Sequence, residues 1–195
     1  MTKTLDIYYS FSSPFAYLAQ TQIPALVERT KCNLNYHLID LKKLWQLTGN
    51  PGPGTIPSKL QYLIKDIENW RKYYNVTLNM PSRFPMDNRP ATAAGIVAQK
   101  EGKLIDFINA VMEGYYINDL DIADAEVLGK IAQDIGINSE NIIAAINDPI
   151  VLKEVDTEAE AAAQRGVFGV PTFFVGDNMY WGNDRLMFVE AALKA

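Results

Sequence analysis

Cysteine and histidine are scarce in this chain of 195 residues, which has one of each, Cys32 and His37. A single cysteine excludes an intramolecular disulfide and a Cys-X-X-Cys redox pair. Two such residues cannot supply the three or four ligands of a zinc site, so we expect no metal. A Ser-His-Asp triad would depend on His37, which lies in a predicted strand. We therefore interpret Cys32 and His37 as structural residues.

Excess positive charge and long apolar runs are also missing. The chain has 18 Lys and Arg against 23 Asp and Glu, a net charge of -5, which argues against nucleic acid or an anionic membrane as a partner. No apolar run approaches the ~18–20 residues of a membrane span. The chain enters a strand pattern almost at once, without a visible secretion signal. Together with the low cysteine content, this leads us to expect a cytoplasmic protein.

The first part of the chain has the pattern of a β-α-β unit. Residues 4–10 and 34–39 are rich in strand-forming side chains. Residues 14–27 between them place apolar side chains at helical spacing. Pro24 lacks a backbone donor, so we expect it to kink this helix.

Helical patterns fill the middle of the chain, after a loop rich in glycine and proline. Apolar stripes at helical spacing predict a series of helices, one ended by Gly136 and another capped by Ser139. The stripes lie in residues 60–70, 104–112, 125–135 and 139–146, and the alanine-rich residues 151–165 are also expected to be helical.

Strand patterns return at the end of the chain. Residues 172–175 and 179–181 flank a turn sequence and predict a β-hairpin, and a last helix should begin near Asp184. We therefore expect an α/β fold, a thioredoxin-like βαβ–ββα sheet domain with a large all-helical insertion. The predicted sheet domain comprises residues 1–54 and 166–195, and the predicted helical domain comprises residues 55–165.

Ser13 lies where the first strand passes into the first helix, directly before Pro14. It is a good helix N-cap, and that structural role alone would explain it. A hydroxyl and free N–H groups at a helix N-terminus also stabilise a nearby thiolate. Thioredoxin-like redox proteins carry a reactive cysteine at this position. Because this chain has none there, the sulfur must arrive with a ligand, for which glutathione is the obvious carrier.

Val170 and Pro171 directly precede the third predicted strand. Proline is common at the start of a strand. The alternative, which the strand order favours, is a cis Val170–Pro171 bond beside the N-terminus of the first helix. Val170 would then offer its N–H and C=O to a peptide-like ligand, as an added strand does.

Four segments together resemble 2-hydroxychromene-2-carboxylate isomerases and are similar to kappa-class glutathione transferases. The resemblance covers nearly the whole chain. The matching segments are residues 13–19 (SPFAYLA), 49–53 (GNPGP), 167–172 (VFGVPT) and 181–186 (WGNDRL).

The resemblance implies glutathione as cofactor and assigns residues to it. Ser13 would favour the glutathione thiolate, Val170 would pair with the glutathione backbone, and Asn50 would line the same cleft. For Asn50 a plain turn role is the alternative, and for Asp184 a plain helix cap. The γ-glutamyl end would be held by Trp181, Gly182, Asn183 and Asp184.

Several positions depart from the family pattern where the substrate is bound. Trp45 stands in place of a lysine, Thr55 and Ile56 in place of an Asn-Arg pair, and Phe84 in place of a tyrosine. Loss of these groups should weaken the binding of a carboxylate substrate. Four cations could compensate, although each is more often a solvated surface charge: Lys42, Lys43, Arg83 and Arg89.

The resemblance implies a glutathione-dependent isomerase of aromatic keto acids, active in the degradation of aromatic compounds and assembled as a homodimer. The thiolate would add to an electron-poor carbon, a bond would rotate, and the thiolate would leave again. Two alternatives stay open. One is a kappa-like glutathione transferase, and the other is a non-catalytic module that binds glutathione or a peptide.

Overall fold

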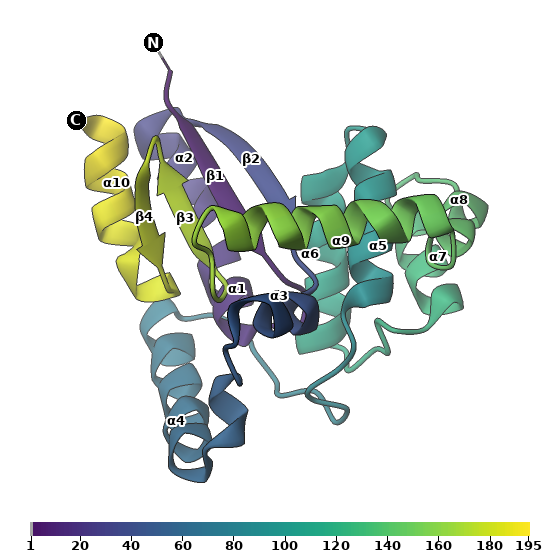
Figure 1. Ribbon diagram of the computed structural model, residues 1–195, viewed down its shortest axis with the longest axis horizontal. Helices are drawn as coiled ribbons and strands as arrows, with labels where there is room; N and C mark the ends of the chain where they lie inside the picture. Colours follow the sequence, from purple (N-terminus) through teal and green to yellow (C-terminus); the bar gives the residue numbers. More distant parts are fainter. Residues whose placement is uncertain (1) are drawn as a thin grey trace.

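The computed structural model describes residues 2–195 and contains one mixed sheet of four strands (Figure 1). The strand order is β2-β1-β3-β4, in which β1 pairs parallel with β2 and antiparallel with β3, and β3 pairs antiparallel with β4. The predicted order of a βαβ unit followed by a ββα unit is confirmed. The strands are β1 (Thr4–Tyr9), β2 (Asn33–Leu38), β3 (Thr172–Val175) and β4 (Asn178–Trp181).

Helices cover both faces of the sheet. Alternate side chains of β1 point to opposite faces, so Leu5, Ile7 and Tyr9 join one core cluster and Tyr8 joins another. The first cluster includes residues of α1 (Pro14–Gln20), α2 (Ile23–Thr30) and α10 (Leu186–Lys194). The second includes residues of α3 (Leu41–Thr48) and α9 (Pro149–Gln164), and α9 crosses in front of the sheet in Figure 1.

The remaining helices lie to one side of the sheet and below it (Figure 1). Helix α4 projects at the bottom of the view, and only Ile67 of its side chains is buried. No helix among residues 2–195 has both the length and the apolar character needed to cross a membrane. The elements are the short 3-10 turn η1 (Pro53–Thr55), α4 (Pro57–Tyr74), α5 (Arg89–Lys100), α6 (Leu104–Tyr116), α7 (Ala125–Asp134), α8 (Ser139–Ala145) and the 3-10 turn η2 (Asn183–Arg185).

Polar side chains start many of these helices. Each accepts a hydrogen bond from an N–H group of the first turn that has no partner within the helix. The capping residues are Ser13 for α1, Asp40 for α3, Asp124 for α7, Asn138 for α8 and Asp148 for α9.

Three local predictions need correction. Pro24 does not kink one helix; it lies in the first turn of a second helix, α2, after a break at Thr21 and Gln22. Asn138 rather than Ser139 caps α8, because its side chain accepts the Glu140 N–H at 2.9 Å. The last helix begins at Leu186, because the 3-10 turn η2 precedes it.

The division into two domains stays a prediction, and its first residue, Met1, lies outside the described residues. Helix α9 belongs to the predicted helical insertion, but it packs along α3 and the sheet. Cys32 is a free, buried cysteine, and His37 stacks on Tyr8 with ring centroids 4.5 Å apart.

Candidate functional site

Ser13 occupies the junction between β1 and α1 and is only 5% exposed. Its Oγ accepts a hydrogen bond from the Ala16 N–H at 3.2 Å, so Ser13 is the N-cap of α1. Pro14 follows as the first helical residue, where a missing N–H has no cost. The cap leaves the positive end of the α1 dipole beside the Ser13 hydroxyl, a setting that favours a negative charge.

Val170 lies against Ser13, as the sequence predicted for the residue before Pro171. The Ser13 hydroxyl donates to the Val170 carbonyl oxygen at 3.4 Å, and the Val170–Pro171 bond is cis, which confirms that prediction. The Val170 N–H makes no hydrogen bond within residues 2–195. Val170 therefore keeps a backbone donor that none of the described residues uses.

Asn50 joins two loops beside Val170. Its Nδ2 donates to the Phe168 carbonyl at 2.9 Å, and its Oδ1 accepts from the Gly52 N–H at 2.9 Å. Both ends of the Asn50 amide are thus engaged within the protein. The side chain holds the segment before Val170 in place, so any effect of Asn50 on a ligand would be through positioning.

Trp181 and Gly182 contact the segment 168–171, which contains Val170. The Trp181 ring meets the Phe168 ring at 4.9 Å between centroids, and half of the Trp181 surface is exposed. Gly182 donates its N–H to the Pro171 carbonyl at 2.9 Å and has a φ of +108°. A Cβ at Gly182 would collide with Oδ1 of Asp184, so this turn requires glycine.

Asn183 and Asp184 are the first two residues of the 3-10 turn η2. Asn183 is 3% exposed, and its carbonyl oxygen accepts from the Tyr74 hydroxyl at 3.0 Å. The Asn183 Nδ2 is buried and has no hydrogen-bond partner in the described part of the chain. The Asp184 carboxylate is partly exposed and pairs with Arg185. The Asp184 carboxylate accepts no hydrogen bond from the first turn of α10, which begins without a side-chain cap, so the plain cap role is excluded.

Asp66 is a carboxylate near this turn that the sequence did not single out. It lies on α4 two turns before Tyr74, on the face that meets η2 through the Tyr74 hydroxyl. Burial raises the pKa of Asp66, the nearby Asp184 carboxylate raises it further, and contact with Trp70 partly offsets both. The spacing of Asp66, Trp70 and Tyr74 is the one signal that could have placed these side chains on a shared helix face.

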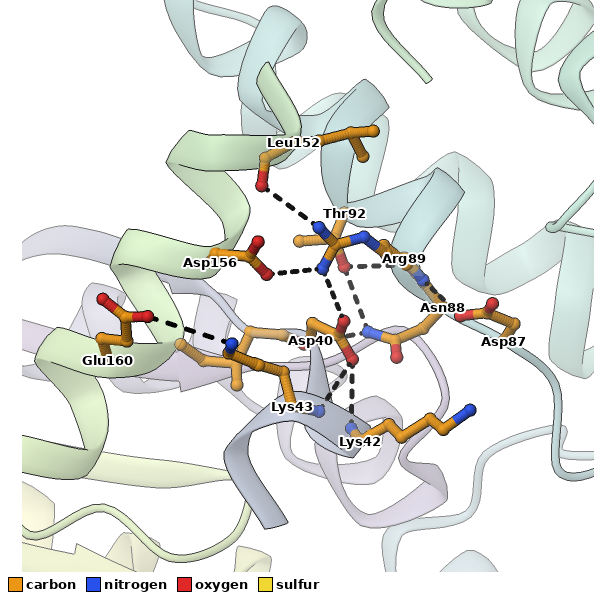
Figure 2. A network of polar contacts seen from close by, with 11 residues as sticks. Asp40, Lys42, Lys43, Asp87, Asn88, Arg89, Thr92, Leu152, Asp156 and Glu160 are labelled. Atoms are coloured by element: carbon orange, nitrogen blue, oxygen red, sulfur yellow. Dashed lines mark hydrogen bonds and ion pairs between the residues drawn. The ribbon is translucent and has the colours of Figure 1, made fainter. Parts of the chain in front are cut away.

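Arg89 is a partly buried cation that is paired within the protein, as Figure 2 shows. Its Nη1 contacts Asp40 at 3.0 Å and Asp156 at 2.8 Å, and its Nη2 donates to the Leu152 carbonyl at 3.2 Å. Hydrogen bonding to Arg89 lowers the pKa of Asp156. These contacts connect α5 to α3 and α9, and they leave Arg89 committed to the fold rather than to a substrate.

The other cations considered for substrate binding differ in their surroundings. Lys43 lies 3.9 Å from Glu160, and Arg83 lies 3.7 Å from Asp121. Lys42 is exposed, and no ion pair involves it among residues 2–195; its side chain points away from the network in Figure 2. Lys42 is therefore the cation of this group without a carboxylate neighbour.

The residues at the divergent positions are mostly apolar or internally bonded. The Trp45 indole packs beside the cluster that includes Val170 and lies against the backbone of Gly52. Phe84 packs against the main core. Ile56 is 40% exposed, and Thr55 bonds through its hydroxyl to the Gly52 carbonyl at 2.9 Å.

A cavity of about 590 Å³ lies elsewhere, between β2, α5 and α9. Its lining includes Tyr36, Gln99 and Glu154 and none of the residues predicted to bind glutathione. The candidate site is therefore the surface formed by Ser13, the Asn50 loop, Val170 and η2.

Comparisons with known proteins agree on one family. The family model of the DSBA-like thioredoxin domain matches residues 4–194. A 2-hydroxychromene-2-carboxylate isomerase from Sphingobium xenophagum is 34% identical over 99% of both chains. The solved structure of a 2-hydroxychromene-2-carboxylate isomerase superposes with a TM-score of 0.88 at 28% identity, covering 97% of this chain and 94% of that one. The predicted fold class is confirmed.

Two more distant proteins are also similar, one in sequence and one in structure. Glutathione S-transferase kappa 1 of Rattus norvegicus is 20% identical over 94% of this chain and 88% of its own length. The cytosolic disulfide reductase DsbM from Pseudomonas aeruginosa, solved with GSH, has a TM-score of 0.68 at 18% identity, with 98% and 100% coverage.

Proposed function

The chain belongs to the 2-hydroxychromene-2-carboxylate isomerases with a DSBA-like thioredoxin domain, and we propose that it is a glutathione-dependent isomerase of aromatic keto acids of this type. The observation that carries the proposal is the contact between the Ser13 hydroxyl, at the N-terminus of α1, and Val170. This contact places the Ser13 hydroxyl, which can stabilise an anion, beside the Val170 backbone. The Val170 N–H has no hydrogen-bond partner among residues 2–195.

The residues around this contact fit the chemical groups of glutathione. Glutathione has an ammonium group, two carboxylates, amides and a thiol. Asp66 and Asp184 are two neighbouring carboxylates suited to an ammonium group. The N–H of Val170 has no hydrogen-bond partner among residues 2–195, so it suits a carboxylate or amide oxygen. The Nδ2 of Asn183 also lacks a partner in this range, but it is buried.

Glutathione, when bound, would supply a thiolate as the nucleophile. Ser13 would stabilise the negative charge with its hydroxyl, which must turn from the Val170 carbonyl toward the sulfur. The α1 dipole would add to this stabilisation. Asn50 would keep Phe168, and with it Val170, in position, and Trp181 would support the same segment from behind.

Three of the four cations that could bind a substrate carboxylate are already paired within the protein. Arg89 has two carboxylate partners and a carbonyl, and Lys43 and Arg83 each have a carboxylate neighbour. We propose that Trp45 and Phe84 contact the aromatic ring of the substrate and that Lys42 is the cation available to its carboxylate.

We also propose that the protein is a cytoplasmic homodimer. Its lone cysteine suits a reducing compartment. Helix α4 exposes large apolar side chains, with Tyr62 at 65%, Ile64 at 55% and Tyr73 at 78% exposure, as helices at subunit interfaces do. Light scattering of the wild type and of Ile64→Glu tests this, with a dimer expected for the first and a monomer for the second.

The function is tested by incubating the protein with 2-hydroxychromene-2-carboxylate, with and without glutathione. We expect isomer to form only with glutathione and the glutathione concentration to stay constant. Steady consumption of glutathione into a conjugate would instead favour a kappa-like transferase. Binding of glutathione without turnover would leave a binding module, and absence of glutathione binding at millimolar concentration would refute the proposal.

A further inference from the structure

Tyr74 is the last residue of α4 and connects that helix to the turn that carries Asp184. Its hydroxyl donates to the Asn183 carbonyl at 3.0 Å, across 109 positions of the sequence. Figure 1 shows the end of α4 directly below the start of α10, which follows this turn. Among residues 2–195 it is the one side-chain hydrogen bond from α4 to another element, since the ion pairs of α4 lie within the helix.

The acceptor of this bond is the peptide group that immediately precedes Asp184. The Asn183 carbonyl and the Asp184 nitrogen belong to one planar unit, so a bond to the oxygen restricts the plane from which Asp184 begins. The start of the turn is fixed separately, because the Gly182 N–H donates to the Pro171 carbonyl at 2.9 Å. The turn η2 is thus bonded on one side to the segment that contains Val170 and on the other side to α4.

The surroundings of Tyr74 suit a fixed donor. Its ring packs against the main core, and its centroid lies 5.2 Å from that of Trp70, so packing restricts the direction of the hydroxyl. Burial raises the pKa of Tyr74, the bond to Asn183 offsets part of this rise, and the nearby Asp184 carboxylate adds to it. The hydroxyl therefore keeps its proton at neutral pH and remains a donor.

We propose that Tyr74 is a positioning residue of the glutathione site, which holds the Asp184 carboxylate near Asp66 in an arrangement that suits the α-ammonium group of the γ-glutamyl end. This inference rests on the proposed function. Tyr74 acts through the Asn183 peptide group and does not touch the ligand. A site whose groups are ordered before the ligand arrives binds more tightly, because less conformational freedom is lost on binding.

Tyr74→Phe in the full chain tests the inference, because it removes the hydroxyl and keeps the ring in the core. Loss of one net hydrogen bond predicts a roughly fivefold rise in the Kd for glutathione, measured by calorimetry. In turnover assays the change should appear in the KM for glutathione rather than in kcat, because Ser13 and the thiol are unaltered.

Tyr36→Phe is the matched control. It removes a hydroxyl that donates to Gln20 Oε1 at 2.7 Å, at the end of α1 rather than at η2. This variant should unfold more readily than the wild type in denaturant, because Gln20 loses its partner. Its Kd for glutathione should equal that of the wild type, so a loss of stability alone does not produce the expected result.

Glutaryl-cysteinylglycine, which is glutathione without its α-amino group, separates positioning from general damage to the site. Its Kd should be the same for the wild type and Tyr74→Phe, because it lacks the ammonium group. An unchanged Kd for glutathione in Tyr74→Phe, an equal weakening of both ligands, or a comparable loss in Tyr36→Phe would overturn the inference and leave the proposed function standing. Absence of glutathione binding by the wild type would refute the proposed function and this inference together.

Discussion

The hydroxyl of Ser13 donates a hydrogen bond to the carbonyl of Val170 at 3.4 Å, across a sequence separation of 157 positions. The same oxygen accepts the Ala16 N–H at 3.2 Å. Ser13 thus closes the start of α1 and touches the segment that precedes β3. Its structural role as a cap and its proposed role toward a thiolate use one atom, so a test must separate them.

Ser13→Gly and Ser13→Ala separate the two roles. Glycine is tolerated at an N-cap with a loss of only a few tenths of a kcal/mol, whereas alanine costs about 1 kcal/mol. Both variants lack the hydroxyl, so glutathione-dependent turnover should fall in both, roughly tenfold for each unit by which the pKa of the thiol rises. The acid limb of the pH–rate profile should move to higher pH. Turnover that falls only in the less stable variant would assign Ser13 to the cap alone.

Gly182→Ala should disturb Asp184. The φ of +108° is unfavourable for alanine, and the added Cβ would collide with Asp184 Oδ1, so we expect a loss of about 1–3 kcal/mol of stability and weaker glutathione binding. Gly176→Ala is the matched control in the β3–β4 turn, since Gly176 also has a positive φ but no atom within 4 Å of a Cβ. Denaturant titration and calorimetry measure both effects. Equal glutathione affinity in the two variants would contradict the proposed role of the turn.

Local signals in the sequence predicted the strands of the sheet. The surroundings of individual side chains depend on tertiary contacts, which the sequence alone did not predict. Strand composition and the turn before Asn178 are local, and they predicted the succession of strands along the chain. Whether Arg89 is solvated or paired is not a local property, because its two carboxylate partners are Asp40, which caps α3, and Asp156, which lies on α9. The proximity of Asp66 to Asp184 was not predicted for the same reason. Helix α4 is largely polar, and nothing in its sequence distinguishes Asp66 from its other carboxylates.

Asp66→Asn should weaken glutathione binding about tenfold or more, because it removes one charge-assisted partner of the ammonium group. The pKa of Asp66 is raised by burial and by Asp184, so its charge is gained as pH rises through that value. Wild-type affinity should therefore increase over this range, and the increase should shrink in Asp66→Asn. Isothermal titration calorimetry across acidic to neutral pH measures this.

The Asp66 experiment has two controls. Glu68→Gln changes a carboxylate on the same helix that pairs with Arg71 and Lys72, and it should leave glutathione affinity unchanged. A glutathione analogue without the α-amino group should bind the wild type and Asp66→Asn equally. If Asp66→Asn weakens the analogue as much as glutathione, Asp66 does not act through the ammonium group.

Arg89→Gln should destabilise the fold by about 2–3 kcal/mol at neutral pH, because Asp40, 5% exposed, loses its countercharge. Lys100→Gln is the control: it breaks an exposed ion pair with Glu154 between the same two helices, α5 and α9, and should cost less than about 1 kcal/mol. Denaturant titration of the three proteins gives the comparison.

The pH dependence provides the sharper test of the Arg89 network. Arg89 lowers the pKa of Asp156 in the folded protein, so this stabilisation is present above the unfolded pKa of about 4 and is lost as pH falls through the lowered folded value. The stability deficit of Arg89→Gln should therefore be largest near neutral pH and should shrink below about pH 4. A deficit that stays constant into this acidic range would mean that Arg89 acts through packing rather than through its carboxylate partners.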